Sequence, residues 1–129
     1  MRYVSLAALF GLSFFMLNAA QGADDIIRIG ILNDQSGLYA DFGGKSSVDA
    51  ARMAVEDFGG KVLGKSIEIV SADHLNKPDM ASAIARRWFD VEGVGAVADL
   101  TNSAVALAVQ QIARTRERLP WPSAPRRRG

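Results

Sequence analysis

Apolar and polar positions follow two different periods between residues 26 and 114, and each period predicts one kind of element. Three short apolar runs with polar or glycine-rich flanks are typical of buried strands; they are IIRIGIL (26–32), SIEIVSA (66–72) and VGAVADL (94–100). Apolar residues three and four positions apart predict helices after each strand; these stretches are residues 45–58, 78–92 and 103–114. The βαβαβα order predicts an α/β fold, in which right-handed crossovers join the strands of a parallel sheet flanked by helices.

The helical spacing also predicts which side chains face the core. Pro78 suits the first turn of the second helix, and Trp88 is expected in the core with Phe89 only partly packed. The other residues expected on the apolar faces are Val48, Ala51, Met53, Ala54, Val55, Phe58, Met80, Ala83, Ile84, Val91, Val105, Leu107, Ala108, Val109 and Ile112.

The first residues resemble an export signal. A basic start is followed by the uncharged run YVSLAALFGLSFFML and by small residues, which predicts a signal peptide over 1–22 with cleavage after Gly22. An uncleaved membrane anchor is the alternative. Export predicts a periplasmic protein with no membrane insertion once the signal is removed. The chain has no cysteine, so its fold in an oxidising compartment must depend on burial without disulfides.

Charge divides the remaining chain into an acidic body and a basic tail. Residues 23–113 contain 8 Lys/Arg and 13 Asp/Glu, whereas residues 114–129 contain 6 Arg and one Glu. The tail also has three prolines, at positions 120, 122 and 125, which argue against a regular fourth strand. We therefore expect a folded body over 23–113 and a tail that is disordered or derived from a frameshift or truncation. A basic arm for nucleic acid or membrane is the alternative, although the acidic body argues against nucleic acid.

Several motifs have the composition of chemical sites but the wrong context. GGKVLGKS (59–66) matches a phosphate-binding loop, yet it is expected to precede a strand, whereas such loops leave a strand and open a helix. GVGAVA (93–98) fails as a dinucleotide motif for the same reason. His74 is the only histidine and no further ligands follow at metal-binding spacing, so we expect a solvated loop and neither metal nor cofactor. Asp34 is the candidate carboxylate of an alternative flavodoxin-like or hydrolase-type enzyme, but no general base accompanies it.

The loops after the three strands are the expected place for a ligand, because open α/β sheets bind ligands at the carboxyl ends of their strands. The first loop (33–44) is long and glycine-rich, and its Tyr39 and Phe42 could cover an apolar group. The second is 73–77. The third, 101–103, starts a helix, where free N–H groups favour a carboxylate. Capping of that helix by an Asn or Ser side chain is the plainer interpretation.

Taken in order behind the predicted signal, three segments carry a resemblance to a known family: IRIGILNDQSGLYADFGG, SVDAARMAVEDFGG, and the stretch from GKSIEIVSADHLN to AVALAVQQIA. Residues 24–113 resemble the amino-terminal part of the periplasmic solute-binding proteins of branched-chain amino acid ABC transporters. The resemblance implies that residues 23–113 form a partial amino-terminal ligand-binding lobe, Rossmann-like and of the type I periplasmic binding protein kind, without enzymatic activity. It also implies a small amino acid, amide or acid as ligand and a membrane permease as partner.

The resemblance also implies roles for single positions. An aromatic residue of the first loop lines the pocket and falls on Phe42, with Tyr39 nearby. The turn that holds the ligand's carboxylate falls on Thr101, Asn102 and Ser103. Some members join the second loop to this turn by a disulfide, at positions occupied here by Asn76 and Thr101, so no bridge can form.

Length is the main departure from the family. Its members are much longer and close two lobes on the ligand, so we expect this chain to fold poorly alone and to bind weakly. A periplasmic ligand-sensing module built on the same lobe is the alternative function.

Overall fold

The computed structural model describes residues 26–121, and the predicted signal peptide and residues 122–129 lie outside this range. The α/β prediction is confirmed, and the predicted strands and helices agree with the structure to within a few residues. They are β1 (Ile26–Asn33), α1 (Gly44–Asp57), β3 (Lys65–Asp73), α2 (Pro78–Asp90), β4 (Val94–Ala98) and α3 (Ser103–Arg114). Among residues 26–121, no helix has the length and apolar character that crossing a membrane would require.

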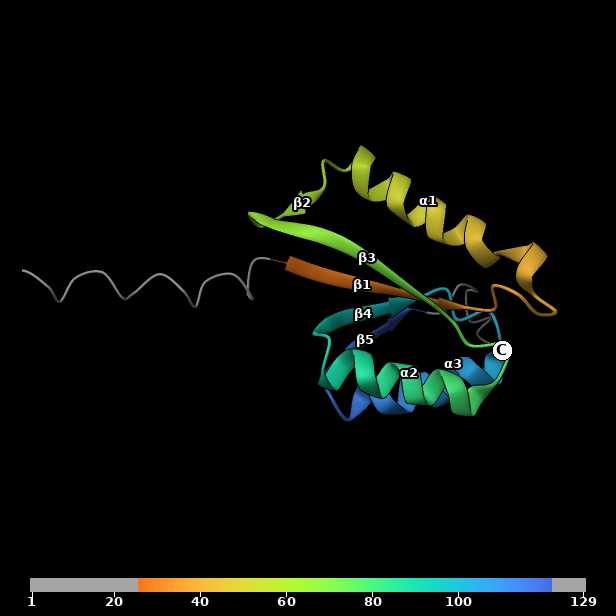
Figure 1. The fold of residues 1–129 in the computed structure, drawn as a ribbon. Coiled ribbons are helices and arrows are strands. Elements are labelled where there is room, and N and C mark those ends of the chain that lie inside the picture. Colours follow the sequence, from red (N-terminus) through yellow and green to blue (C-terminus); the bar gives the residue numbers. More distant parts are fainter. Residues whose placement is uncertain (1–25, 122–129) are drawn as a thin grey trace, which may run out of the picture.

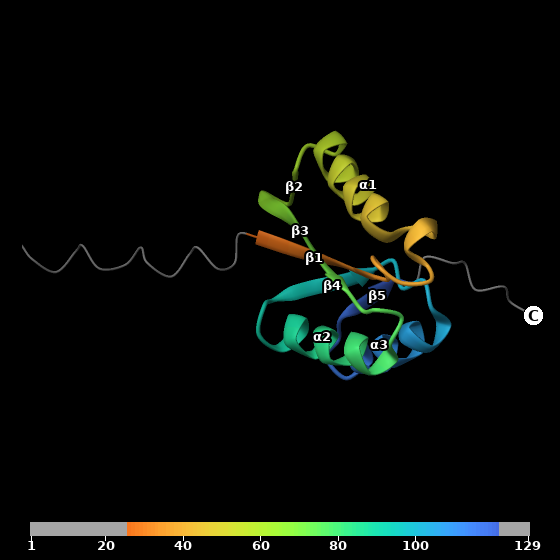
Figure 2. The same cartoon turned by 45° about the vertical axis from the view of Figure 1, so that its right-hand side comes forward.

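The strands form one twisted sheet in the order β2-β3-β1-β4-β5 (Figure 1). β1 lies in the middle and pairs in parallel with both β3 and β4. Helix α1 covers one face of the sheet, and α2 and α3 cover the other, as the two views in Figures 1 and 2 show. The chain therefore leaves β1 toward one face and leaves β3 and β4 toward the opposite face.

The segment predicted as a turn between the first helix and the second predicted strand contains a short strand of its own, β2 (Lys61–Val62). It pairs antiparallel with β3 through a two-residue hairpin turn at Leu63 and Gly64, both of which have positive φ. Two paired residues are too few to produce a period in the sequence. Because β3 follows directly, residues 59–66 do not open a helix and lack the geometry of a phosphate-binding loop.

The prediction that prolines prevent a fourth parallel strand is wrong. Strand β5 (Leu119–Trp121) pairs in parallel with β4, with Pro120 opposite Val97. Within residues 26–121, β5 has only β4 as a neighbour in the sheet. An edge strand needs hydrogen bonds on one side only, so a proline without an N–H is tolerated there.

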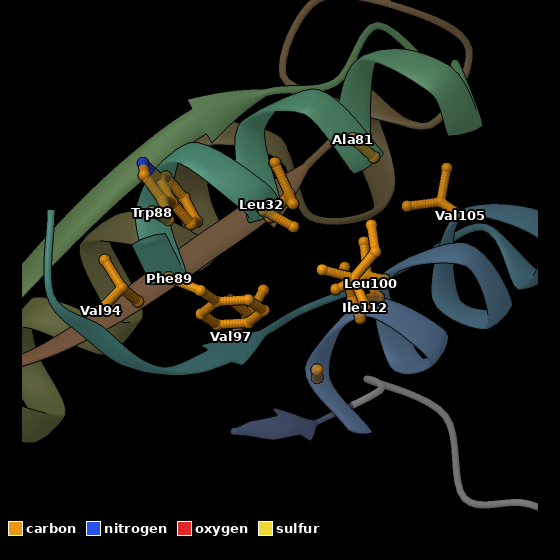
Figure 3. Packing of buried hydrophobic residues seen from close by; sticks show 12 residues of the cluster. Leu32, Ala81, Trp88, Phe89, Val94, Val97, Leu100, Val105 and Ile112 are labelled. Carbon is orange, nitrogen blue, oxygen red and sulfur yellow. The ribbon is translucent and has the colours of Figure 1, made fainter. Parts of the chain in front are cut away.

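The main core lies between the sheet and the α2–α3 pair (Figure 3). Trp88 and Phe89 of α2 are both buried, so the expectation that Phe89 is only partly packed is wrong. Trp88 lies flat against β1 at Gly30, where an added Cβ would come within 2.3 Å of the Trp88 ring. The other buried members are Leu32, Ala81, Ala85, Val94, Val97, Leu100, Val105, Val109, Ile112 and Ala113.

The opposite face of the sheet is covered more thinly. Val48 of α1 is buried, but Met53 and Phe58 are 63% and 66% exposed, contrary to the predicted apolar face. A single helix contacts the sheet through a narrow stripe only, so the outer part of a broad apolar face stays in solvent. Five further predicted core residues are also exposed: Ala54, Met80, Ala83, Val91 and Leu107.

Replacing Gly30 by alanine should destabilise the fold. The new methyl group would overlap the Trp88 ring, which is buried and has little room to move. Overpacking of this kind costs roughly 1–3 kcal/mol of unfolding free energy. Chemical denaturation of the chain measures this loss.

Gly95→Ala on the neighbouring strand is the matched control, because its added Cβ would lie 3.8 Å from the Arg28 carbonyl oxygen, an ordinary contact. Equal stability of both variants would contradict the role given to Trp88.

Candidate functional site

The loops that leave β1, β3 and β4 meet at the carboxyl edge of the sheet. The β1 loop turns toward α1, whereas the β4 loop turns toward α3 on the other face (Figure 1). Adjacent strands whose connections leave in opposite directions define a topological switch point, the usual ligand site of an open α/β sheet. Three polar contacts, one for each pair of loops, hold this edge together.

The first contact joins the β1 loop to the β4 loop through Asn33, the last residue of β1. Its buried side-chain amide donates to the Asp99 carboxylate and to the Gly44 carbonyl oxygen, both at 2.7 Å. Asp99 itself has a φ of 63°, a conformation that Asp tolerates better than most residues. The start of α1 and the end of β4 are therefore fixed to the same side chain.

The second contact joins the β1 loop to the β3 loop through Asp73. Its carboxylate accepts hydrogen bonds from the Ser36 hydroxyl at 2.6 Å, from the Leu75 amide at 2.7 Å and from the Gln35 amide at 3.2 Å. Burial acts to raise the pKa of Asp73, but these hydrogen bonds outweigh it and hold that pKa below its usual value. The hydrogen bonds between the two loops thus stabilise the charged form of the Asp73 carboxylate.

The third contact joins the β3 loop to the β4 loop. The Asn102 side-chain amide donates to Asn76 Oδ1 at 2.5 Å. Asn102 Oδ1 accepts from the amides of Ala104 and Val105 and so caps α3. The capping interpretation of this turn is correct, and both ends of the Asn102 amide are already engaged.

His74 is buried at 0% exposure, so the expectation of a solvated loop is wrong. The backbone amide of His74 donates to the Asn33 carbonyl oxygen, which extends the pairing of β1 and β3 by one residue and pulls the side chain inward. Nδ1 accepts a hydrogen bond from the Asn76 amide at 3.0 Å. Burial lowers the pKa of His74, and the nearby carboxylates of Asp34, Asp73 and Asp99 act in the opposite direction but more weakly.

Asp34, the carboxylate of the alternative enzyme hypothesis, has a structural role. It is 1% exposed and accepts from the amides of Gly37 at 2.8 Å and Tyr39 at 2.9 Å. Both oxygens therefore shape the β1 loop. Among residues 26–121, no three histidine, aspartate or glutamate side chains gather in a way that could hold a metal ion.

The aromatic residues predicted to line a pocket lie on the β1 loop, next to the short 3-10 helix η1 (Ala40–Phe42). Phe42 is 85% exposed, and Tyr39 is half-buried. Their rings are tilted with centroids 6.3 Å apart. The two rings thus form one apolar surface on the loop.

The polar residues predicted to hold a ligand lie at the start of α3. Thr101 is half-buried, and its hydroxyl has no hydrogen-bond partner within the part of the chain that the structure describes. Ser103 is exposed in the first turn of α3. The start of α3 thus lies at the edge where the three loops meet, with the Ala104 and Val105 amides capped by Asn102.

Sequence reasoning missed the pairings that organise this edge, namely those of Asn33, Asp73 and Asn76. A signal for their proximity existed, because all three follow or end predicted strands whose carboxyl ends share one edge. Their individual partners, up to 66 residues away in the chain, have no signal in a single sequence.

Comparison with known proteins gives a family for this arrangement. The family model described as periplasmic binding protein matches residues 26–126. No match was found among curated proteins.

Solved structures show the same fold at substantial identity. A periplasmic binding protein from Burkholderia mallei is 47% identical with a TM-score of 0.74, over 76% of this chain and 26% of that protein. A periplasmic ligand-binding protein of a branched-chain amino acid ABC transporter from Burkholderia xenovorans is 45% identical with a TM-score of 0.73, over 76% and 26%. An ABC transporter solute-binding protein from Rhodopseudomonas palustris, in complex with 4-hydroxybenzoate, is 30% identical with a TM-score of 0.64, over 75% and 26%. The chain therefore spans about a quarter of the length of these proteins.

Replacing Asn102 by alanine should destabilise the start of α3. The change removes the cap on two amides and also the contact with Asn76, so we expect a loss of about 1–2 kcal/mol in unfolding free energy. Chemical denaturation and amide hydrogen exchange of Ala104 and Val105 measure it.

Ser103→Ala is the control one residue further on, because Ser103 is exposed and should change stability by less than about 0.5 kcal/mol. The role of Asn102 is refuted if the two variants unfold at the same denaturant concentration.

Proposed function

Because the chain belongs to the periplasmic binding protein family, we propose that it acts as the extracytoplasmic solute-binding component of an ABC importer. The proposed ligands are branched-chain amino acids or related small acids and amides. The observation that carries the proposal is the turn before α3, where the Thr101 hydroxyl has no hydrogen-bond partner within residues 26–121 and the helix starts at the switch point between β1 and β4.

A carboxylate is the ligand group that this site suits best. The amides in the first turn of a helix and the positive end of its dipole favour an anion. Amino acids and hydroxybenzoates share a carboxylate, which fits both the branched-chain amino acid transporter relative and the relative in complex with 4-hydroxybenzoate. We propose leucine, isoleucine or valine as the ligand. An aromatic acid is the second ligand to be tested.

The residues proposed to contact the ligand have distinct roles. The Thr101 and Ser103 hydroxyls would donate to the carboxylate together with the amides of the turn. Asn102 would contribute through its backbone, because its side chain is occupied by the cap and by Asn76. Tyr39 and Phe42 would cover the apolar part of the ligand.

The remaining parts of the proposal follow from the family. Periplasmic binding proteins are extracytoplasmic and deliver solutes to a membrane permease, so we propose a periplasmic location, reached through the predicted signal peptide over 1–22, and a permease partner. The structural role of Asp34 supports a protein without enzymatic activity. The proposed partners include no nucleic acid.

The chain should bind a small carboxylate weakly, because the described residues supply one wall of the site and the match covers only 26% of the relative's length. We expect dissociation constants on the order of millimolar for L-leucine or 4-hydroxybenzoate, about 4 kcal/mol of binding free energy. Titration followed by ¹H–¹⁵N NMR should shift the amides of Thr101, Asn102 and Ser103 first.

Thr101→Val should weaken this binding about five- to tenfold, because it removes one hydroxyl at unchanged shape. Thr115→Val at the other end of α3 is the control and should bind like the parent. Absence of any shift near α3 with both probes would refute the proposed site, and micromolar binding measured by calorimetry would refute the expected weakness.

A further inference from the structure

The side chain of His74 lies at the centre of the loop edge but does not belong to the proposed ligand contacts. It is fully buried, and Nδ1 accepts the amide proton of Asn76. A neutral imidazole has one donor and one acceptor, so an accepting Nδ1 places the proton on Nε2. Within residues 26–121, Nε2 has no hydrogen-bond partner.

The turn held by His74 leads directly to the start of α3. Leu75 and Asn76 both have positive φ, at 50° and 55°, and the Lys77 amide closes the turn on the His74 carbonyl oxygen at 2.9 Å. For a leucine this conformation is unfavourable, so the turn depends on the hydrogen bonds around it. Asn76 Oδ1 then accepts from Asn102, whose other end caps α3. Hydrogen bonds thus connect the imidazole, through Asn76 and Asn102, to the Ala104 and Val105 amides at the start of α3.

Protonation of His74 is incompatible with the first of these hydrogen bonds. An imidazolium carries protons on both nitrogens, so Nδ1 would face the Asn76 N–H as a second donor. The charged groups around it are the carboxylates of Asp34, Asp73 and Asp99, one from each loop, and the exposed Lys77 follows in the chain. The carboxylates would attract the imidazolium and offer it acceptors in place of its contact with Asn76.

We propose that His74 is a positioning residue for the start of α3, and that its protonation releases the contact between Asn76 and Asn102. The ligand consequence rests on the proposed function, since that start is the proposed carboxylate site. Release would loosen the Thr101–Ser103 turn and weaken the binding of a carboxylate at low pH.

The direction of the pH effect on stability agrees with this proposal. Burial favours the neutral imidazole and lowers the pKa of His74 from 6.5, so the folded chain binds fewer protons than the unfolded chain just below that pH. The contribution of His74 to the unfolding free energy is therefore fully present above about pH 6.5. It decreases as the pH falls toward the folded-state pKa of His74. The contribution of Asp73 is lost in a separate window, as the pH falls below 3.8.

Proton titration of the whole chain by NMR tests the proposal. His74 is the only histidine, so its imidazole signals are unambiguous. As the pH falls from about 8 to below 6.5, the Asn102 side-chain amide and the Ala104 and Val105 amides should shift with the same midpoint as the imidazole. Titration of the imidazole without any change at Asn102 would overturn the proposal.

Two variants separate positioning from general stability. His74→Asn keeps an acceptor near Nδ1 but cannot be protonated, so its Asn102 signals should stay constant down to about pH 5. Asn76→Gly keeps the positive φ and removes Oδ1, the acceptor of the Asn102 side-chain amide. In this variant the Asn102 side-chain amide protons should therefore lie upfield of their parent positions even near neutral pH. Leu75→Gly is the matched control at the adjacent position and should titrate like the parent. If His74→Asn does not fold, the parent and Asn76→Gly titrations decide the matter.

Binding of L-leucine and 4-hydroxybenzoate gives the ligand consequence. Affinity should fall in the parent over the same pH range below 6.5 in which the imidazole titrates, and stay constant in His74→Asn. A parallel loss in both proteins would overturn the role of His74. Absence of binding to either probe near pH 7.5 would refute the proposed function instead, and the Asn102 titration would still decide whether His74 positions the turn.

Discussion

The hydrogen bonds of Asn33 hold the loop edge, and the positions of the other loop residues depend on them. Asn33 is fully buried at the end of the central strand and binds the start of α1 and the end of β4 at once. A buried amide left without partners costs about 1–3 kcal/mol, so neither loop can move away at low cost. The pairs Asp73–Ser36 and Asn76–Asn102 complete the connection of all three loops. The edge is thus held by polar contacts rather than by apolar packing.

The two faces of the sheet support this edge unequally. α2 and α3 enclose nearly all of the buried apolar side chains, with Trp88 pressed against Gly30 of β1. α1 contributes Val48 as its buried apolar residue and leaves Met53 and Phe58 in solvent. The body of α3 is consequently fixed by a packed core, whereas the loop with Tyr39 and Phe42 is held mainly by Asp34 and Asp73. Regions with few buried contacts open locally at lower cost, so we expect the aromatic loop to adapt to a ligand that the α3 turn holds in place.

Hydrophobic periodicity predicts the strands and helices that are long enough to bury one of their own faces. It does not predict features that arise from pairing between segments far apart in the chain. The strands β1, β3 and β4 have five residues or more, and their apolar runs predict them. The strands β2 and β5 have only two and three residues and form by pairing with a neighbouring strand. The stripe on α1 was predicted, but the helical period cannot tell that Val48 meets the sheet and Phe58 does not. The place of the candidate site followed from the rule that parallel strands end at one edge. The burial of His74 did not, because it depends on the Asn33 carbonyl oxygen that extends the strand pairing.

The strength of the contact between the β3 loop and the α3 turn determines how well the proposed site is preorganised before a ligand binds. A disulfide between such loops is implied for some members of the family and typically contributes 2–4 kcal/mol. Here Asn76 and Asn102 make the connection by one hydrogen bond, worth about 1 kcal/mol. A contact of this strength forms and breaks without any redox chemistry, so small changes in its surroundings shift its occupancy. It is also the contact that depends on the strained Leu75–Asn76 turn and on the acceptor state of His74. A single hydrogen bond at this place therefore leaves the start of α3 more responsive to the local environment than a disulfide would, while the α2–α3 core keeps the rest of the helix in place.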